Sequence, residues 1–272
     1  MKQAVVRLAV LGDPLRYTRS PDLHRAGAQA MGLACESEAL PTPASELRAT
    51  LERLAASGYL GCNLTMPLKE PALACLHSVS APARRARSVN TVTFHSDGAH
   101  GDSTDGAGFV DLLASLDRDA TGTRVLCLGA GGAVRSLALA LADAGSPATR
   151  VVSRREPGAE EAWGGALGAR WSAWGSAAAR EAVTTADVIV NGTPLGGEQL
   201  AGVLDDAKRG TLVVDLTYAE AVTPWVLEAR RRGLESVDGL GLLVHQARHA
   251  LSIWFQREVP LAPLAAAVGW PR

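Results

Sequence analysis

Two ionisable residues, Lys69 and Asp105, carry the chemistry for which this sequence is best suited. Lys69 ends the segment Asn63 to Lys69 (NLTMPLK), and Asp105 ends the polar run Gly101 to Asp105 (GDSTD). Oxidation of an alcohol by hydride transfer needs a group that accepts the hydroxyl proton, and the reverse reaction needs a donor. A partly buried lysine close to an aspartate could do both. Considered separately, the lysine could be a surface residue and the aspartate a helix N-cap.

Further polar clusters follow predicted strands in the first hundred residues. They are Thr18 to Pro21, Asn63 to Lys69, Ser88 to Thr91 and Gly101 to Asp105. In open α/β sheets, ligands bind at the carboxyl ends of the strands. The hydroxyls, amides, lysine and aspartate of these clusters could therefore converge on a polyhydroxylated acid.

A glycine-rich segment later in the chain is typical of a nucleotide site. Residues Val125 to Arg135 read VLCLGAGGAVR, which is a buried strand, three glycines and a predicted helix. Gly129 permits the tight turn, Gly131 lets the backbone approach a pyrophosphate, and the helix N-terminus supplies N–H groups and a positive dipole. A tight turn without a ligand is the alternative, since Val134 occupies the place of the third usual glycine.

The end of the following strand distinguishes NADP from NAD. NAD sites usually place an acidic residue there to bind the ribose hydroxyls. Here the residues are Ser153, Arg154 and Arg155, and no carboxylate occurs before Glu156. Because guanidinium groups bind phosphate in bidentate fashion, this pattern favours the 2′-phosphate of NADP. A solvated arginine pair after a strand is the alternative.

The elements that must position these residues alternate between strand and helix. Strands are predicted at 5–11, 35–40, 61–65, 88–94, 124–128, 149–153, 188–191 and 212–216. Helices are predicted at 20–31, 42–56, 67–76, 105–116 and 132–144, the first with Ser20 as its N-cap. Strands that alternate with helices form parallel sheets covered by helices, so the predicted fold class is α/β. The stretch from Gly158 to Ala179 gives no clear element.

The composition excludes several classes of protein. The 272 residues are enough for two modest domains, and a 47% hydrophobic content indicates a packed globular protein. The net charge of −1 indicates no nucleic-acid partner. No apolar stretch approaches the roughly 18 residues of a membrane span, and no signal peptide is recognisable, so we expect a cytoplasmic protein.

No metal site is expected from the cysteines or histidines. The four cysteines form no C-x-x-C pair and are typical of small buried residues in a reducing compartment. His245 and His249 lie four residues apart on a probable helix, but no third ligand accompanies them.

Taken together, the motifs resemble those of the shikimate dehydrogenase family from Gly12 to Trp254. They occur in the family's order: GDPLRYTRSPDLH (12–24), NLTMPLK (63–69), SVNT (88–91), GDSTDGAGF (101–109), GAGGAVR (129–135), SRR (153–155), NGTPLG (191–196), DLTY (215–218) and DGLGLLVHQA (238–247). The resemblance implies two α/β lobes. The substrate-binding domain would be residues 1–104, completed by C-terminal helices in 240–272, and the Rossmann-type NADP-binding domain would be residues 105–239.

The resemblance also implies an activity and a set of site residues. The activity is the reversible, NADPH-dependent reduction of 3-dehydroshikimate to shikimate in the chorismate pathway of aromatic amino-acid biosynthesis, with Lys69 and Asp105 as the catalytic pair. The residues implied to bind the substrate are Thr18, Ser20, Asn63, Thr65, Asn90, Thr104, Tyr218 and Gln246. The residues implied to bind NADP are Gly129, Ala130, Gly131, Gly132, Ala133, Ser153, Arg154, Arg155, Thr193 and Gly239. The expected partners are the small-molecule substrate alone, without nucleic acid or membrane, and the expected state is a monomer or homodimer.

Departures from the family pattern put the identity of the substrate in doubt. The family's H-S-x-S-P is here Tyr17 to Pro21, with Thr18 in place of the first serine, and Ser103 replaces the asparagine of N-T-D. A paralogous dehydrogenase of quinate or a related hydroxy acid is therefore an alternative function. A catalytically silent NADP-binding sensor is a second alternative, against which the intact Lys69 and Asp105 argue.

Overall fold

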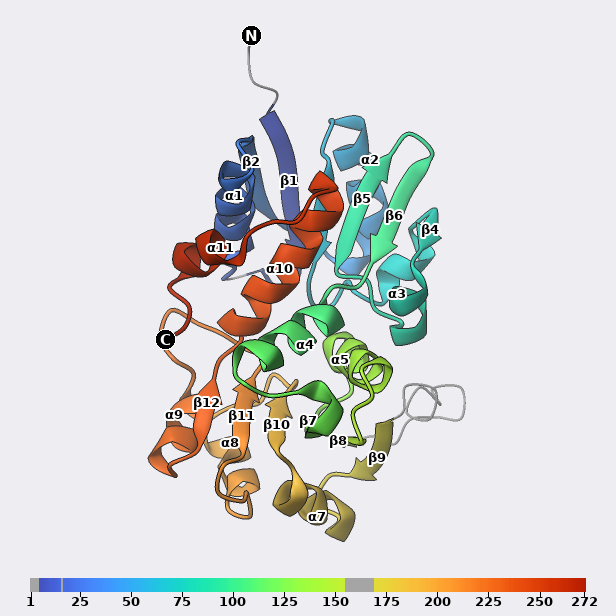
Figure 1. Ribbon diagram of the computed structural model, residues 1–272. Helices are drawn as coiled ribbons and strands as arrows, with labels where there is room; N and C mark the ends of the chain where they lie inside the picture. Colours follow the sequence, from blue (N-terminus) through green and yellow to red (C-terminus); the bar gives the residue numbers. More distant parts are fainter. Residues whose placement is uncertain (1–4, 16, 155–168) are drawn as a thin grey trace. The chain divides into compact units, whose positions relative to one another are not determined.

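The computed structural model describes residues 5–15, 17–154 and 169–272 (Figure 1). The chain divides into two compact units. Unit 1 comprises Met1–Gly108 and Leu243–Trp270, and unit 2 comprises Phe109–Leu242 and Pro271–Arg272. Each unit is α/β, which confirms the predicted fold class. Lys69 and Asp105 lie in the same unit, whereas the predicted boundary between residues 104 and 105 separated them.

Unit 1 is built on a six-stranded mixed sheet with the strand order β2-β1-β3-β5-β6-β4. Its strands are β1 (Val5–Gly12), β2 (Ala34–Pro41), β3 (Gly61–Leu64), β4 (Ser78–Val79), β5 (Thr91–His95) and β6 (Gly98–Asp102). β1 pairs in parallel with β2 and β3, while β5 runs antiparallel to β3 and β6.

This topology brings the polar clusters to one edge of the unit 1 sheet. β1 ends at Gly12 and β3 ends at Leu64, and the two strands are parallel neighbours. The antiparallel β5 starts at the same edge, because Thr91 pairs with Asn63 of β3 and with Asp102 at the end of β6. Segments that are far apart in the sequence therefore meet beyond this edge.

Helices cover both faces of the unit 1 sheet (Figure 1). They are α1 (Ser20–Ala30), α2 (Leu47–Ala56), α3 (Ala81–Ala86), α11 (Leu261–Val268) and the greater part of α10 (Leu240–Phe255), with 3-10 turns η1 (Ala44–Glu46) and η2 (Pro71–Ala74). α10 packs closely on β3 and β5, because Trp254 Nε1 donates to Val92 O at 3.0 Å. A Cβ on Gly61 would lie 2.3 Å from that nitrogen, so this contact requires glycine.

Two local predictions for unit 1 are wrong. The helix expected at 67–76 is a turn followed by the 3-10 helix η2. Pro71 explains the difference, because in the interior of an α-helix it has no backbone N–H to bond to residue 67 and its ring clashes with the carbonyl of that residue. Ser20 is the first residue of α1 and not its N-cap, which is Arg19.

Unit 2 is a doubly wound domain with a six-stranded parallel sheet of order β12-β11-β10-β7-β8-β9. The strands are β7 (Arg124–Leu128), β8 (Ala148–Ser153), β9 (Ala169–Ala173), β10 (Val188–Asn191), β11 (Leu212–Asp215) and β12 (Glu235–Val237). The helices are α4 (Asp105–Ser115), which starts in unit 1, α5 (Gly132–Asp143), α7 (Ala177–Thr185), α8 (Glu198–Ala201) and α9 (Pro224–Arg231), with 3-10 turns η3 (Ala120–Gly122) and η5 (Gly202–Leu204). The four strands predicted in this region are confirmed to within one residue. The strand order reverses between β7 and β10, which is where such sheets bind ligands.

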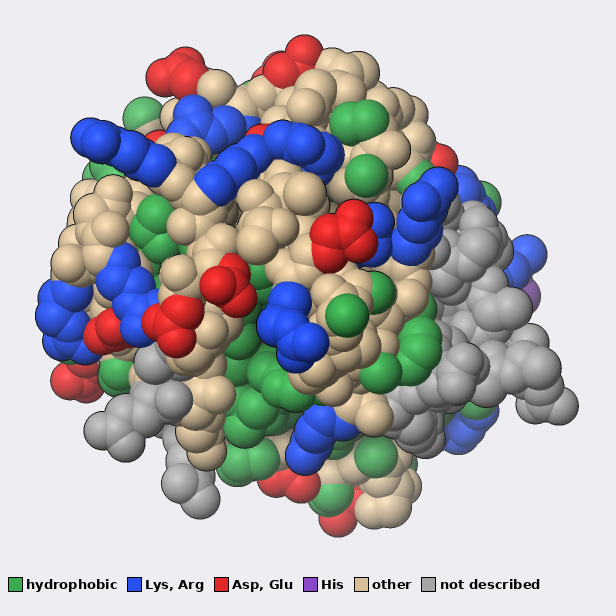
Figure 2. All heavy atoms as spheres, turned by 90° about the horizontal axis from the view of Figure 1, so that it is seen from below, with side chains coloured by type: hydrophobic (Ala, Val, Ile, Leu, Met, Phe, Trp, Pro, Cys, Tyr) green, Lys and Arg blue, Asp and Glu red, His purple; other side chains and the backbone are tan. Residues whose placement is uncertain are grey.

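Two features of the described residues bear on possible partners: the distribution of surface charge and the length of the apolar helices. On the face shown in Figure 2, Lys and Arg side chains are interspersed with Asp and Glu around hydrophobic patches. Among the described residues, no helix is long and apolar enough to cross a membrane.

Candidate active site

Lys69 and Asp105 form a largely buried ion pair at the polar edge of the unit 1 sheet. Lys69 Nζ donates to Asp105 Oδ2 at 2.6 Å, and the two side chains are 20% and 6% exposed. Lys69 lies in the turn after β3, and its carbonyl oxygen accepts from Val89 N at 2.8 Å. Asp105 is the first residue of α4, where the helix dipole stabilises negative charge. The structure thus brings together the two residues that the sequence singles out.

The side chain of Asn90 orients the second oxygen of the Asp105 carboxylate. Asn90 Nδ2 donates to Asp105 Oδ1 at 2.8 Å, and it also lies 2.9 Å from Thr104 Oγ1 and 3.2 Å from Gln246 Oε1. Asn90 Oδ1 accepts from the backbone N of Thr104 at 2.8 Å. Asn90, Thr104 and Gln246 are buried. Because both polar atoms of the Asn90 amide are bonded, this network holds Asp105 in one orientation.

Asn63 is held by a buried histidine that the sequence analysis did not single out. Asn63 Nδ2 donates to Asn90 O at 2.9 Å, and Asn63 Oδ1 lies 2.8 Å from His24 Nε2. Burial lowers the pKa of His24 to about 4, so the ring is neutral near pH 7. A neutral imidazole has one donor and one acceptor. Nε2 must donate to the Asn63 oxygen, and Nδ1 accepts from Ser37 Oγ at 2.7 Å.

The position of His24 could have been read from helix spacing. His24 follows Ser20 by four residues on α1, so both lie on one face of that helix. Both are buried, and the edge of the His24 ring meets Trp254 with the ring centres 5.3 Å apart. A polar residue on the buried face of a helix needs partners, and this was the available signal.

Two hydroxyl groups face each other at the start of α1. Thr18 Oγ1 and Ser20 Oγ are 3.3 Å apart, and Ser20 N donates to Thr18 Oγ1 at 3.3 Å. The first N–H groups of an α-helix point outward and favour an anion. Thr65 follows β3 at the same edge, where its Cγ2 lies 2.4 Å from the Cβ position of Gly12. These three hydroxyl residues therefore lie beyond the strand ends, as the sequence predicts.

In unit 2, the glycine-rich turn has the backbone form of a phosphate cradle. Gly129 has φ +100°, a conformation that favours glycine, and its N donates to Val152 O at 2.7 Å. Among the described residues, no atom lies within 4 Å of the Cβ position of Gly131, so the turn is open there. Ala130 and Gly131 form the turn, and Gly132 and Ala133 open α5.

Val134 in place of the third glycine is accommodated from the opposite side. A Cβ on Gly192 would lie 2.2 Å from Val134 Cγ2. Because Gly192 has no side chain, the loop after β10 leaves room for Val134. The close approach of α5 to the sheet is therefore preserved. The same loop packs on the turn, because Thr193 Cγ2 lies 2.9 Å from the Cβ position of Gly129. Val134 in the place of the third usual glycine is therefore compatible with a nucleotide site.

The end of β8 presents only part of the predicted adenosine site. Ser153 Oγ accepts from Trp171 Nε1 of β9 at 2.8 Å, which fixes the Ser153 hydroxyl. Arg154 is exposed directly after it. Arg155 lies outside the described residues. Trp171 was missed because its stretch of sequence shows no periodicity.

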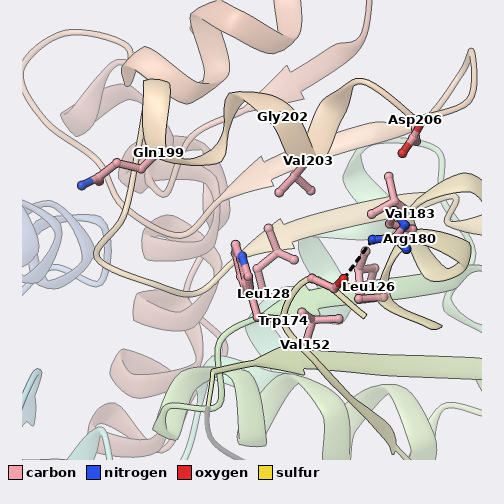
Figure 3. A pocket seen from close by; sticks show the side chains of 12 residues that line it. Leu126, Leu128, Val152, Trp174, Arg180, Val183, Gln199, Gly202, Val203 and Asp206 are labelled. Carbon is pink, nitrogen blue, oxygen red and sulfur yellow. Dashed lines mark hydrogen bonds between the residues drawn. The ribbon is translucent and has the colours of Figure 1, made fainter. Parts of the chain in front are cut away.

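An apolar pocket of about 310 Å³ adjoins this end of the sheet (Figure 3). Leu128 and Val152, which directly precede Gly129 and Ser153, line it together with Trp174 and Val203. Arg180, whose Nη1 donates to Gly175 O at 2.9 Å, and Asp206 also line the pocket. The pocket thus offers apolar surface beside the glycine turn.

A buried carboxylate ties together the loops after β10 and β11. Asp215 Oδ1 accepts from Asn191 Nδ2 at 3.1 Å, and Asp215 Oδ2 accepts from Thr223 Oγ1 at 2.8 Å. Burial raises the pKa of Asp215, and these hydrogen bonds oppose the rise. Asn191 Oδ1 in turn accepts from Thr193 Oγ1 at 2.7 Å. The network therefore positions Thr193, a predicted cofactor residue.

The remaining predicted residues of unit 2 lie on neighbouring loops. Tyr218 follows β11 and is partly exposed. Gly239 follows β12, and its N donates to Thr217 O at 2.9 Å. A Cβ on Gly239 would lie 2.4 Å from Leu216 O, so the close approach of these loops requires glycine.

Known proteins share both units of this chain. A family model described as the shikimate dehydrogenase substrate binding domain matches residues 10–92. A shikimate dehydrogenase (NADP(+)) from Gluconobacter oxydans is 38% identical over 254 residues, which are 90% of this chain and 88% of the relative. A crystal structure of shikimate 5-dehydrogenase from Thermus thermophilus, in complex with NADP(H) and shikimate, is 32% identical with a TM-score of 0.84 and covers 97% of this chain and 98% of that one. The ligand-free 5-ketofructose reductase of Gluconobacter sp. strain CHM43 is 26% identical with a TM-score of 0.81 and covers 98% of each chain.

Proposed function

Because this chain belongs to the shikimate dehydrogenase family, we propose that it is an NADP-dependent shikimate dehydrogenase, which reversibly reduces 3-dehydroshikimate to shikimate for aromatic amino-acid biosynthesis. The observation that carries this proposal is the Lys69–Asp105 pair at the polar edge of unit 1. A donor and an acceptor of protons lie there, 2.6 Å apart, beside a fixed array of amides and hydroxyls.

Lys69 and Asp105 would handle the proton of the reacting oxygen. In the reduction, the Lys69 ammonium donates a proton to the carbonyl oxygen as the hydride arrives at carbon. In the oxidation, the neutral amine accepts the hydroxyl proton. Asp105 holds the Lys69 amine in place through the hydrogen bond that its carboxylate accepts. Asn90 keeps the carboxylate turned towards Lys69.

The substrate would be recognised by the side chains around this pair. Thr18 and Ser20, at the start of α1, would bind the carboxylate. The hydroxyl groups would meet the remaining residues of the proposed substrate site: Asn63, Thr65, Asn90, Thr104, Tyr218 and Gln246. A site built to hydrogen-bond several hydroxyls rejects analogues that lack them, because its own polar groups would be left unpaired. On this proposal, unit 1 is the substrate-binding domain.

NADP fits the residues of unit 2 that the structure describes. The open turn from Gly129 to Ala133 would hold the pyrophosphate at the N-terminus of α5. Ser153 and Arg154, with Arg155, would bind the 2′-phosphate, and the pocket against Leu128 and Val152 offers apolar surface to the adenine ring. Thr193 and Gly239 would lie by the ribose and nicotinamide. When bound, the cofactor supplies the hydride.

The activity is tested by absorbance of NADPH. Purified protein is incubated with NADP and saturating shikimate from neutral to alkaline pH. We expect NADPH to form, and NADH to form much more slowly when NAD replaces NADP. No turnover at any of these pH values would contradict the proposal.

A related hydroxy acid is a second candidate substrate. Thr18 adds a methyl group beside the expected carboxylate, and a 5-ketofructose reductase shares the fold. The same assay with quinate and other polyhydroxylated acids separates the candidates. A kcat/KM for one of these acids above that for shikimate would replace shikimate as the substrate.

The cellular setting follows from the same function. We propose a cytoplasmic enzyme, which the four free cysteine thiols support, because disulfides are rare in that compartment. A monomer or homodimer stays a prediction, and light scattering of the purified chain measures it.

A further inference from the structure

Three of the six histidines gather around the turn between β5 and β6. His95 is the last residue of β5, Asp97 lies in the turn, and His100 is in β6. His77 directly precedes β4, and its backbone N donates to Ala99 O at 2.9 Å. Because β5 starts at the polar edge of the sheet, this turn lies at the opposite end of the hairpin from the Lys69–Asp105 pair.

The approach of His77 to the turn depends on a glycine. Gly98 has φ +140°, and a Cβ there would lie 2.6 Å from His77 Cβ. The parallel pairing of β4 with β6 places Ser78 opposite His100, so the His77 and His100 ring centres are 5.6 Å apart. The backbone thus brings together the imidazole that precedes β4 and the imidazole of β6.

One donor atom each of His77, Asp97 and His100 lies within 4.8 Å of the other two. A tetrahedral metal site with bonds of about 2 Å separates its donor atoms by roughly 3.3 Å. A movement of roughly 1.5 Å would therefore close these side chains around one ion. His77 and Asp97 are exposed, so their side chains can rotate that far at little cost.

The His100 ring has the second contact that metal-binding histidines usually have. His100 Nδ1 lies 2.9 Å from Ser78 Oγ, which leaves Nε2 directed at Asp97 Oδ1, 3.0 Å away. Metal binding at Nε2 requires the tautomer in which Nδ1 donates to Ser78 Oγ, and the ion then replaces the hydrogen bond between Nε2 and Asp97. The His95 ring packs edge-on against His100, with centres 4.7 Å apart.

We propose that His77, Asp97 and His100 bind one divalent transition-metal ion of the class of Zn²⁺, with water completing the coordination. Two imidazoles and a carboxylate suit this class, whereas Mg²⁺ and Ca²⁺ prefer oxygen ligands alone. The ion links the segment before β4 to the β5–β6 hairpin and so stabilises this edge of the unit 1 sheet. The inference is independent of the proposed enzyme activity.

Metal titration of the full chain tests the site. The protein, with any affinity tag removed, is stripped with chelator and titrated with ZnCl₂ by calorimetry and with Co²⁺ by visible absorption. We expect one equivalent to bind with a Kd below roughly 100 μM and to raise the Tm. Mg²⁺ at the same concentration should do neither.

Single substitutions identify the ligands. We expect His77→Ala and His100→Ala each to weaken Zn²⁺ binding by about tenfold or more, and the double variant to show no Zn²⁺-induced rise in Tm. His249→Ala, on α10, is the matched control and should bind like the parent chain. Circular dichroism establishes that each variant is folded. The proposal is overturned if the parent chain binds no equivalent of Zn²⁺, or if the double variant binds as tightly as the parent.

Discussion

The two candidate binding regions of this chain differ in composition: one is formed by side chains and the other by backbone. The polar edge of unit 1 consists of side chains whose amides, hydroxyls and charges are bonded to one another, with Asn90 in contact with Thr104, Asp105 and Gln246. The glycine turn of unit 2 and the loop packed on it consist mainly of backbone. Their shape depends on the absence of side chains at Gly129, Gly131 and Gly192. A substitution in the first region should change the chemistry, and one in the second should change packing or cofactor affinity.

The largest expected effect is on the chemistry of unit 1. Asp105→Asn keeps the shape of the side chain and an acceptor for Asn90, but it removes the charge beside Lys69. We expect kcat to fall by about 100-fold or more, with the Kd of NADP unchanged. Steady-state kinetics and cofactor titration measure the two quantities. A kcat within threefold of the parent value would remove Asp105 from its proposed role.

Packing in unit 2 should give the next largest effect. Gly192→Ala places a methyl group 2.2 Å from Val134 Cγ2, and we expect it to lower the free energy of unfolding by about 2–3 kcal/mol. Val134→Ala removes the obstructing methyl groups, so the double variant should recover part of the loss. Urea denaturation of the parent, both single variants and the double variant gives the coupling. Strictly additive losses would show that the two residues do not compensate for one another.

His24 makes the stability of unit 1 depend on pH. The pKa of the folded-state ring is about 4, while the unfolded chain takes up a proton near the ordinary value of about 6.5. The contribution of neutral His24 to the free energy of unfolding is therefore fully present above pH 6.5 and is lost as the pH drops towards 4. We expect the free energy of unfolding to fall by roughly 2 kcal/mol between pH 7 and pH 5. Urea denaturation at both pH values measures the fall, and His24→Asn should lack this part of it. An equal fall in the variant would assign the pH dependence to other groups.

Cofactor choice should respond to a smaller change in unit 2. Arg154→Ala removes a guanidinium group from the proposed 2′-phosphate site, and we expect NADP binding to weaken by about 1.5 kcal/mol, or roughly tenfold. NAD, which lacks that phosphate, serves as the control and should bind as before. Fluorescence titration with both cofactors measures the difference. Equal losses for the two would place Arg154 elsewhere on the cofactor.

The sequence predicts well what is local and periodic. The buried strands β7 and β10 have their predicted bounds, and the ends of β1 and β3 present the expected polar clusters. The edge strand β12 is only three residues long and was missed, as was β9 in a stretch without periodicity. Short strands carry little pattern of their own and depend on their neighbours for pairing.

The sequence does not predict contacts that depend on strand register. Gly192 compensates for Val134 although Gly192 is on the loop after β10 and Val134 is in α5. His77 and His100 meet only because β4 pairs with β6 in one register. His24 of α1 forms a hydrogen bond with Asn63 of β3, and nothing in the sequence indicates that these two residues are in contact. Such pairs become visible only when the fold is known.

Replacement of Lys69 tests the central claim most directly. Lys69→Ala removes the proposed proton donor, and Lys208→Ala, which removes the lysine bound to Asp187 in unit 2, is the matched control. With shikimate and NADP as substrates, we expect Lys69→Ala to lower kcat by about 100- to 10,000-fold while the Kd of NADP stays within twofold, and Lys208→Ala to leave kcat unchanged. A Lys69→Ala enzyme that turns over shikimate at the parent rate would contradict the account.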